Sequence, residues 1–223
     1  MTYFVIGDAH RTGGDARDIF SCRPNSGADL RRFVAHVRDT VKPGVDPIVR
    51  VGDWHDAWLG RKARVSGCKD GEDGLWLPND IIIMGNHDPA DGVAEVVLEV
   101  GGRKILVTHG ARFDKYNCGV RRWIGWSSTR IAGRVMDLNG SPITTTGETV
   151  VEYLHRLIGH TLDLDAFEAA AEKYRILMGA DVIVCGHTHV AKVTPTYANP
   201  GAWLQRGYLQ IDDDGTITLN RWE

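Results

Sequence analysis

Polar clusters follow five short apolar runs in this chain, and their side chains are of the types that bind metal ions. The clusters contain aspartate, asparagine and histidine, and six of the nine histidines of the chain belong to them. Their members are Asp8, His10, Asp53, His55, Asp56, Asn86, His87, Asp88, His109, His187 and His189. Histidine nitrogen and carboxylate oxygen bind zinc, manganese and iron, and no thiolate is among them. The pattern therefore predicts a site for divalent metal ions.

Spacing within the clusters is compatible with one metal ion or two. Alternate residues share a face of extended backbone, so Asp8-x-His10 and His187-x-His189 can each grip one ion or straddle two. An aspartate at the end of a central strand, such as Asp53, can bridge two cations with its two oxygens. A pair of divalent ions polarises a phosphoryl group and lowers the pKa of a bridging water. The chemistry that fits this set is hydrolysis of a phosphate ester.

Asn86 and His87 are adjacent and call for different roles. Asn86 offers a neutral oxygen, which limits negative charge where an anionic substrate must bind. His87 follows it directly and cannot easily bind the same ion. We expect His87 to act as the general acid to the leaving oxygen, with a nearby carboxylate that orients it and raises its pKa.

The strand before each cluster must position it. The five apolar runs are nearly continuous, which is typical of strands buried on both faces. They span 3–6, 47–51, 81–84, 104–107 and 182–185. Ligand sites in open α/β sheets form beyond the carboxyl ends of strands, so we expect the clusters to meet at one edge.

Helices and hairpins complete the predicted elements. Helical periodicity covers 28–41, 148–158 and 165–178; Thr145 with Glu148 forms a capping-box pattern, and Asp165 with Glu168 gives a similar signal. Hairpins are predicted for 95–107 around a Gly-Gly turn and for 208–220. The class is α/β or α+β, a mixed sheet flanked by helices, and two sheets packed face to face are compatible with it.

Five motifs taken in order resemble those of the calcineurin-like metallophosphoesterases. They are Asp8-x-His10, Gly52-Asp53-x-x-Asp56, Gly85-Asn86-His87-Asp88, His109 and Gly186-His187-x-His189. Each motif alone is weak, but five in order over nearly the whole chain are specific. The resemblance implies a four-layer α/β/β/α sandwich of two mixed sheets that carries a two-metal centre.

The same resemblance implies a role for each matched residue. Asp8, His10, Asp53 and His189 would hold the first metal, and Asp53, Asn86, His109 and His187 the second. His87 would protonate the leaving group, and Asp56 would pair with His87. We expect two divalent ions, with manganese as the first choice and iron or zinc as alternatives.

Within the superfamily, the chain looks most like the UDP-2,3-diacylglucosamine hydrolase group. The likeness lies in the segments 52–58, 108–114 and 199–203. The chain has Ala111 and Ala202 at two positions where that group commonly has aspartate. It also lacks the Gly-Asp-x-x-Asp-Arg-Gly and Asn-His-Glu motifs of the protein phosphatases, which argues against a phosphoprotein phosphatase.

A strand-free stretch after Gly110 predicts a helical, cap-like insertion over 112–178 within a single domain that spans 1–223. Between 112 and 134 six basic residues face a single acid, Asp114, and tryptophan and isoleucine are interleaved with them. We expect Arg121, Arg122 and Trp123 to contact substrate, and the 112–134 segment to be available for peripheral membrane contact. The two tryptophans of this segment fit internal packing or an exposed apolar patch equally well.

Composition, net charge and cysteine content narrow the classes of protein to which the chain can belong. The 223 residues include 43% apolar and 25% charged residues, which excludes intrinsic disorder as the main state. A net charge of −3 indicates no clear nucleic-acid partner, and no apolar run reaches transmembrane length. Four cysteines without a CxxC pair fit a reducing compartment, so we expect a cytoplasmic protein.

These observations predict a metal-dependent hydrolase of anionic, phosphate-containing substrates. We expect it to attack a phosphodiester or pyrophosphate bond through a metal-bridged hydroxide. The alternatives are a phosphomonoesterase, or a nuclease or cyclic-nucleotide phosphodiesterase with the same metal centre. A non-catalytic scaffold is the least favoured, because no ligand position is lost.

Overall fold

A computed structural model describes most of the chain. The described residues are 1–11, 26–40, 46–56, 58, 76–88, 92–115, 117, 121–139 and 162–223. The helix predicted over 148–158, together with its capping residues, lies outside them.

The first sheet has five strands in the order β10-β9-β1-β2-β3. Their bounds are β1 Tyr3–Ile6, β2 Ile48–Val51, β3 Ile81–Ile83, β9 Gly207–Ile211 and β10 Ile217–Arg221. Strands β1, β2 and β3 are parallel, with Val5 opposite Val49, whereas β9 runs antiparallel to β1 and to β10. The predicted C-terminal hairpin is confirmed as β9 and β10.

The second sheet also has five strands, in the order β4-β5-β6-β8-β7. Their bounds are β4 Glu95–Val100, β5 Arg103–Thr108, β6 Val182–Val184, β7 Lys192–Val193 and β8 Tyr197–Asn199. Strands β5, β6 and β8 are parallel, and the predicted β4–β5 hairpin is confirmed. Gly101 and Gly102 take φ values of 58° and 76° in its turn, which glycine adopts without steric cost.

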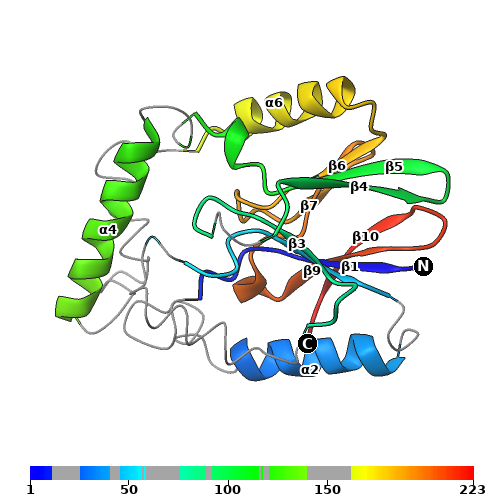
Figure 1. The fold of residues 1–223 in the computed structure, drawn as a ribbon, viewed down its shortest axis with the longest axis horizontal. Helices are drawn as coiled ribbons and strands as arrows, with labels where there is room; N and C mark the ends of the chain where they lie inside the picture. The colour runs from blue at the N-terminus through cyan, green and yellow to red at the C-terminus, as the bar shows by residue number, and fades with distance from the viewer. Residues whose placement is uncertain are drawn as a thin grey trace.

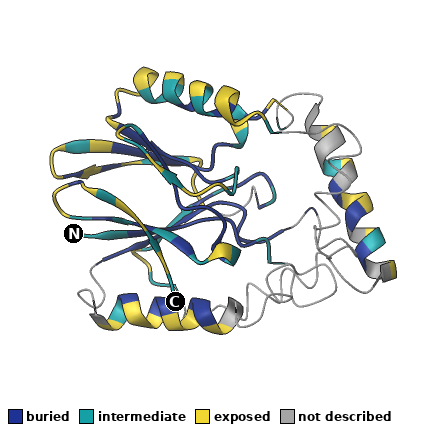
Figure 2. Cartoon of the chain, turned by 180° about the vertical axis from the view of Figure 1, so that it is seen from behind, coloured by how far each residue is buried: buried dark blue, intermediate teal, exposed yellow. Residues whose placement is uncertain are grey.

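Two sheets and two outer helices form four layers, seen edge-on in Figure 1. Val5, Val49, Val107 and Val184 belong to the core cluster that joins the two sheets. Helix α2 (Ser26–Thr40) packs Phe33 and its neighbours on the first sheet, and α6 (Leu164–Leu177) covers the second. In Figure 2 these helices turn exposed residues outward and buried ones toward the sheets. The predicted sandwich of two mixed sheets is therefore confirmed.

Helix α6 begins one residue earlier than predicted and uses a different cap. The side chain of Asp163 accepts a hydrogen bond from the backbone N–H of Ala166, so Asp163 is the N-cap. Asp165 lies in the first turn instead, where its charge favours the positive end of the helix. The predicted capping role of Asp165 was therefore wrong.

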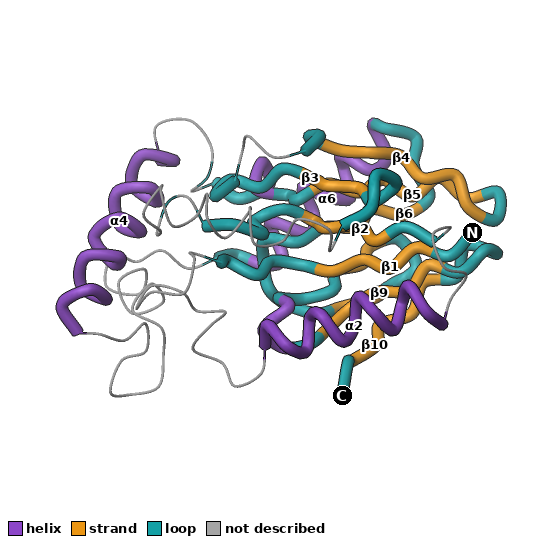
Figure 3. Tube along the Cα trace, turned by 60° about the horizontal axis from the view of Figure 1, so that its bottom comes forward, coloured by secondary structure: helices purple, strands orange, loops and turns teal. Residues whose placement is uncertain are grey.

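Helix α4 (Arg121–Asn139) stands apart from the layers. Figures 1 and 3 place it beyond the ends of the strands, on the side of the molecule opposite the N-terminus. Helix α6 falls inside the predicted insertion of 112–178, yet it forms the outer layer on the second sheet. The boundaries of the insertion stay a prediction. Among the described helices, none combines the length and apolar character needed to cross a membrane.

Candidate metal centre

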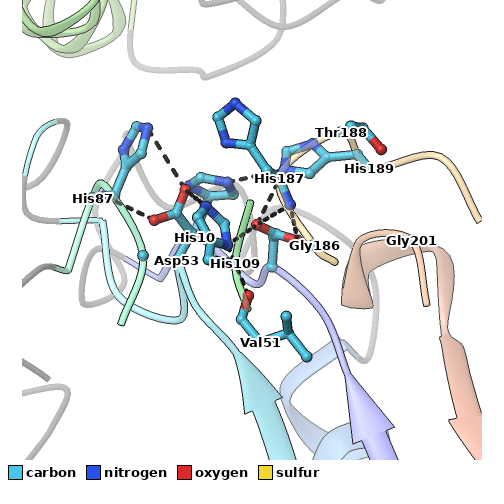
Figure 4. A network of polar contacts seen from close by, with 12 residues as sticks. His10, Val51, Asp53, His87, His109, Gly186, His187, Thr188, His189 and Gly201 are labelled. Atoms are coloured by element: carbon cyan, nitrogen blue, oxygen red, sulfur yellow. Dashed lines mark hydrogen bonds and ion pairs between the residues drawn. The ribbon is translucent and has the colours of Figure 1, made fainter. Parts of the chain in front are cut away.

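The loops that follow β1, β2, β3, β5 and β6 meet at one end of the sandwich. Figure 4 shows five histidine rings gathered around the Asp53 carboxylate, above the ends of the strands. All seven predicted metal ligands lie here, namely Asp8, His10, Asp53, Asn86, His109, His187 and His189. The structure thus brings together side chains that are up to about 180 residues apart in the sequence.

The donor atoms form three overlapping groups, and within each group the ligand atoms lie within 4.8 Å of one another. The groups are Asp8, His10 and His189; His10, Asp53 and His87; and Asp53, His109 and His187. The first and third fall within the sets that the family resemblance assigns to the two metals, which add Asp53 to the first and Asn86 to the second. The middle group places His87, the predicted general acid, beside Asp53.

His109 has a ring nitrogen that faces two oxygens. Its Nδ1–H donates to the carbonyl oxygen of Val51 at 2.8 Å, which directs Nε2 into the site. Nε2 lies 3.0 Å from Oδ1 of Asn86 and 3.1 Å from Oδ2 of Asp53. A lone pair on Nε2 would repel both oxygens, so the arrangement requires a proton or a cation between them. The donor set therefore fits a divalent ion.

His10 presents the same requirement on the other side of the site. Its Nδ1 donates to Oδ2 of Asp56 at 3.1 Å, and its Nε2 faces Nε2 of His189 at 3.1 Å. Two imidazole nitrogens at this distance need a proton or a cation between them. Burial lowers the pKa of His189 to about 4, so this ring is neutral and offers a lone pair. Oδ1 of Asp8 completes the group at 3.8 Å from His189 Nε2.

Backbone strain is concentrated at these ligands. His10, Asp53, His187 and His189 have φ values of 51°, 48°, 65° and 58°. Left-handed conformations of non-glycine residues cost about 1–3 kcal/mol each and cluster at functional sites. Among the described residues other than glycine, only Arg206 shares this conformation. Four predicted metal ligands therefore reach the centre from strained backbone conformations.

Glycines let the ligand loops approach one another closely. A Cβ on Gly85 would lie 2.0 Å from Oδ1 of Asp53, and one on Gly52 would lie 2.6 Å from Nδ1 of His109. A Cβ on Gly186 would lie 2.8 Å from Oδ2 of Asp8. These contacts explain why glycine precedes each of the three polar clusters.

Replacing Gly85 by alanine is expected to disturb the metal centre directly. The new methyl group must displace Asp53, because both its carboxylate and its backbone nitrogen lie within 2.3 Å of the ideal Cβ position. We expect the free energy of unfolding to fall by about 1–3 kcal/mol and metal content to fall with it. Urea denaturation and elemental analysis measure the two effects. Gly102→Ala is the control for metal content alone: its φ of 76° also strains alanine and should lower stability, but no atom lies within 4 Å, so its metal content should stay unchanged. Unchanged metal content in Gly85→Ala would contradict the steric argument.

Asp88 links the loop after β2 to the loop after β3. Its buried carboxylate accepts backbone N–H groups from Asp53, Trp54, His55 and Gly85 at 2.7–3.2 Å. Burial, and then the charge of Asp53, raise the pKa of Asp88, while the backbone hydrogen bonds oppose this. These bonds fix the loop that carries Asp53 against the loop that carries Gly85.

His87 and Asp56 form the predicted pair. The Nδ1–H of His87 donates to Oδ1 of Asp56 at 2.8 Å, and Nε2 of His87 lies 4.0 Å from Oδ2 of Asp53. Trp58 stacks on the His87 ring at 4.4 Å. Burial raises the pKa of Asp56, but the charges and hydrogen bonds of His87 and His10 hold it well below its usual range. Asp56 is therefore an ionised acceptor shared by a predicted metal ligand and the predicted general acid.

The family comparison agrees with this geometry. The model of the calcineurin-like phosphoesterase family matches residues 1–191. The chain belongs to the calcineurin-like phosphoesterase family. Members of this family are metal-dependent hydrolases of phosphoesters, and the donor groups that contain His189 and His109 are the sites available for divalent ions. The finer likeness to the UDP-2,3-diacylglucosamine hydrolase group stays a prediction.

Several solved structures are similar to this calcineurin-like phosphoesterase. A predicted phosphoesterase from Streptococcus pneumoniae is 18% identical, with a TM-score of 0.47 over 99% of this chain and 88% of that one. Vps29 of Entamoeba histolytica, complexed with zinc, is 15% identical, with a TM-score of 0.48 over 99% and 97%. Vacuolar Protein Sorting 29 from Cryptosporidium parvum is 16% identical, with a TM-score of 0.46 over 98% and 95%. None of the curated proteins compared with the chain matches it.

Not every residue singled out in the sequence joins the centre of this phosphoesterase. Trp54 is buried in the core between α2 and the first sheet. His55 is buried, and its backbone N–H donates to Asp88. Trp123 is exposed on α4, whereas the side chains of Arg121 and Arg122 lie outside the described part of the structure.

Sequence reasoning missed two residues that do reach the centre. Asp114 and Asn117 lie 3.1 Å and 3.3 Å from Nε2 of His187. Asp114 could have been found as the single acid in a basic segment. Asn117 carried no such signal.

Metal binding to this phosphoesterase is expected to release protons. Burial lowers the pKa of His10 and His109, but Asp56 raises that of His10 to about 9, and Asp53 and Asp8 raise that of His109 to about 10. Without metal, both rings are protonated on both nitrogens at pH 7. An incoming cation must displace the proton from the nitrogen that it binds. We therefore expect about two protons released per protein and an affinity that falls as the pH falls below 9.

Calorimetric titration with manganese in buffers of different ionisation enthalpy measures this release. The observed heat should vary linearly with the buffer enthalpy, with a slope equal to the number of protons. Identical heats in all buffers would contradict the expected displacement.

Proposed function

We propose that this calcineurin-like phosphoesterase is a two-metal-dependent hydrolase of phosphodiester or pyrophosphate bonds. The observation that carries the proposal is the pair of donor groups that contain His189 and His109, beside the His87–Asp56 pair. Asp53 belongs to the group with His109, and its carboxylate also lies within 4.8 Å of a ring nitrogen of His10 in the other group.

The proposed ligand sets follow the donor groups. Asp8, His10, Asp53 and His189 would hold the first ion, and Asp53, Asn86, His109 and His187 the second, with manganese as the first choice and iron or zinc as alternatives. Bound divalent ions would supply Lewis acidity, which lowers the pKa of water and offsets charge on phosphoryl oxygens. Nitrogen and oxygen donors without thiolate suit all three metals.

His87 would deliver a proton to the leaving oxygen. Its Nδ1–H donates to Asp56, so Nε2 is the nitrogen that faces the centre. Asp56 accepts a hydrogen bond from His87 and orients the ring, and Trp58 restricts rotation of the ring by stacking on it. An acid held in this way is matched to a leaving group that needs a proton.

Charge in the centre supports a diester over a monoester. The carboxylates of Asp8, Asp53 and Asp114 would offset three of the four positive charges that two divalent ions bring. A metal-bridged hydroxide would offset the fourth. A centre without net positive charge suits a diester or pyrophosphate, which carries one negative charge at each phosphorus, better than a doubly charged monoester.

A substrate panel with added manganese tests the proposal. The substrates are bis-p-nitrophenyl phosphate, p-nitrophenyl phosphate, cyclic nucleotides, UDP-2,3-diacylglucosamine and single-stranded DNA. We expect bis-p-nitrophenyl phosphate to be hydrolysed faster than p-nitrophenyl phosphate. A preference for the monoester would overturn the diester assignment, and no hydrolysis by the fully loaded protein would favour a scaffold role.

The exposed face of helix α4 favours a large anionic, amphiphilic substrate, or a membrane surface, as the partner of this hydrolase. Trp123, Ile131 and Leu138 are 68%, 54% and 86% exposed, and they share one helix face with the exposed Arg130 and Arg134. The opposite face is buried and carries Thr129, Ala132 and Met136. A helix with apolar and cationic residues on its exposed face is suited to the surface of anionic lipid.

Replacing both Arg121 and Arg122 by alanine tests the role of this segment in substrate choice. We expect the KM for UDP-2,3-diacylglucosamine to rise by about tenfold or more, since each cation near an anionic surface contributes about 1 kcal/mol. Turnover of bis-p-nitrophenyl phosphate should stay nearly intact, and the defect should shrink at high salt because salt screens the attraction. An equal loss on both substrates in a folded variant would show that the segment supports the metal centre and would remove the cap interpretation.

A further inference from the structure

Asp114 is a buried carboxylate at the start of the basic segment, with only 4% of its surface exposed. It follows the short 3-10 turn η1 (Ala111–Phe113), directly downstream of β5. Its Oδ2 lies 3.1 Å from Nε2 of His187, a predicted ligand of the second metal. An ionised carboxylate only accepts hydrogen bonds, so the contact requires the proton of His187 on Nε2.

Local contacts hold the Asp114 carboxylate in place. The Nδ2 of Asn117 donates to the same Oδ2 at 2.8 Å, and the backbone N–H of Asn117 donates to the Asp114 carbonyl at 2.9 Å. The backbone N–H of Asp114 donates to the carbonyl of Ala111 at 3.2 Å. The turn therefore fixes where the carboxylate meets the imidazole.

The ring of His187 is held on its other sides as well. Phe167 stacks on it with an interplanar angle of 16°, and His109 meets it edge-on at 5.2 Å. Its backbone N–H donates to Asp8 at 3.2 Å. With Nε2 bound to Asp114, Nδ1 is the nitrogen left to join Asp53 and His109 around a cation.

We propose that Asp114 is a positioning residue for the second metal, because it fixes the tautomer and the orientation of His187. The inference rests on the proposed two-metal function and extends it to a residue inside the predicted insertion. Carboxylates that bind the far nitrogen of a metal-ligating histidine raise its basicity, and their loss weakens metal affinity by about 10–100-fold. Asp8, His10, Asp53 and His189 would hold the first ion, and His187 is not among them.

The tautomer can be read without any metal or substrate. In long-range ¹H–¹⁵N spectra of the metal-free protein, His187 is expected to be protonated on Nε2. Asp114→Ala should lose this signature, and Asp114→Glu should restore it in part. A wild-type spectrum with the proton on Nδ1 alone, or one unchanged in Asp114→Ala, would overturn the proposal.

Titration with manganese alone gives the second readout. Wild-type protein should bind two ions; Asp114→Ala should bind one of them about 10–100-fold more weakly and the other as before. Asp114→Asn keeps the shape of the side chain and a neutral acceptor, so a loss of about tenfold is expected, and this variant covers the case in which alanine fails to fold. Asp213→Asn, an exposed carboxylate in the β9–β10 turn, is the control and should bind both ions normally.

The outcomes separate the two proposals. If wild-type protein binds fewer than two ions, the two-metal function fails. The histidine spectra still test whether Asp114 fixes the tautomer of His187. If wild-type protein and Asp114→Ala bind two ions with equal affinity, the two-metal function stands and the role of Asp114 is refuted.

Discussion

Asp53→Asn is expected to abolish metal-dependent hydrolysis. Burial raises the pKa of Asp53, but the charges of His109 and His87 hold it well below its usual range, so this carboxylate is ionised at every working pH. An amide has one neutral oxygen and cannot bridge two cations. Losing several kcal/mol of charge stabilisation corresponds to a drop of about 10³-fold or more in turnover.

Elemental analysis and the rate on bis-p-nitrophenyl phosphate measure this result together. We expect metal content to fall along with the rate. Asp165→Asn removes an exposed carboxylate from the first turn of α6 and is the matched control, with unchanged rate and metal content. Full activity of Asp53→Asn would remove the two-metal mechanism.

Most of the fold could be predicted because its signals are local. Runs such as 48–51 and 182–184 are nearly all β-branched, and a glycine follows each within two residues, so both the strand and the loop after it were visible. The Gly101-Gly102 turn marked its hairpin in the same way. Parallel strands then carried the predicted ligands to one edge, because loops after parallel strands emerge on the same side.

Contacts between segments distant in sequence could not be predicted from local signals. Asp88 bonds the loop after β2, about 35 residues earlier in the sequence. Asp114 was visible as the single acid in a basic segment, but its contact with His187, which follows β6, was not. Trp58 stacks on His87, which no pattern in the sequence indicated. In each case a buried group contacts a residue distant in the sequence, and such contacts leave no local signal.

His87→Ala is expected to separate proton donation from metal binding. The ring contacts Asp56 and Trp58, and His87 is absent from the proposed ligand sets, so both ions should remain bound. A positioned general acid contributes about 10²–10⁴-fold, and we expect a loss of this size on substrates with poor leaving groups. With p-nitrophenolate, which leaves without a proton, the loss should be much smaller.

A series of phosphodiesters with leaving groups of increasing pKa makes the test quantitative. The rate of the variant should fall steeply along the series, whereas the wild-type rate should depend on it weakly, because His87 supplies the proton as the bond breaks. His36→Ala, on the exposed side of α2, is the matched control and should follow the wild-type line. Equal losses across the series would mean that His87 acts in another way, such as binding the phosphoryl oxygens, and the assignment of the acid would pass to a different group.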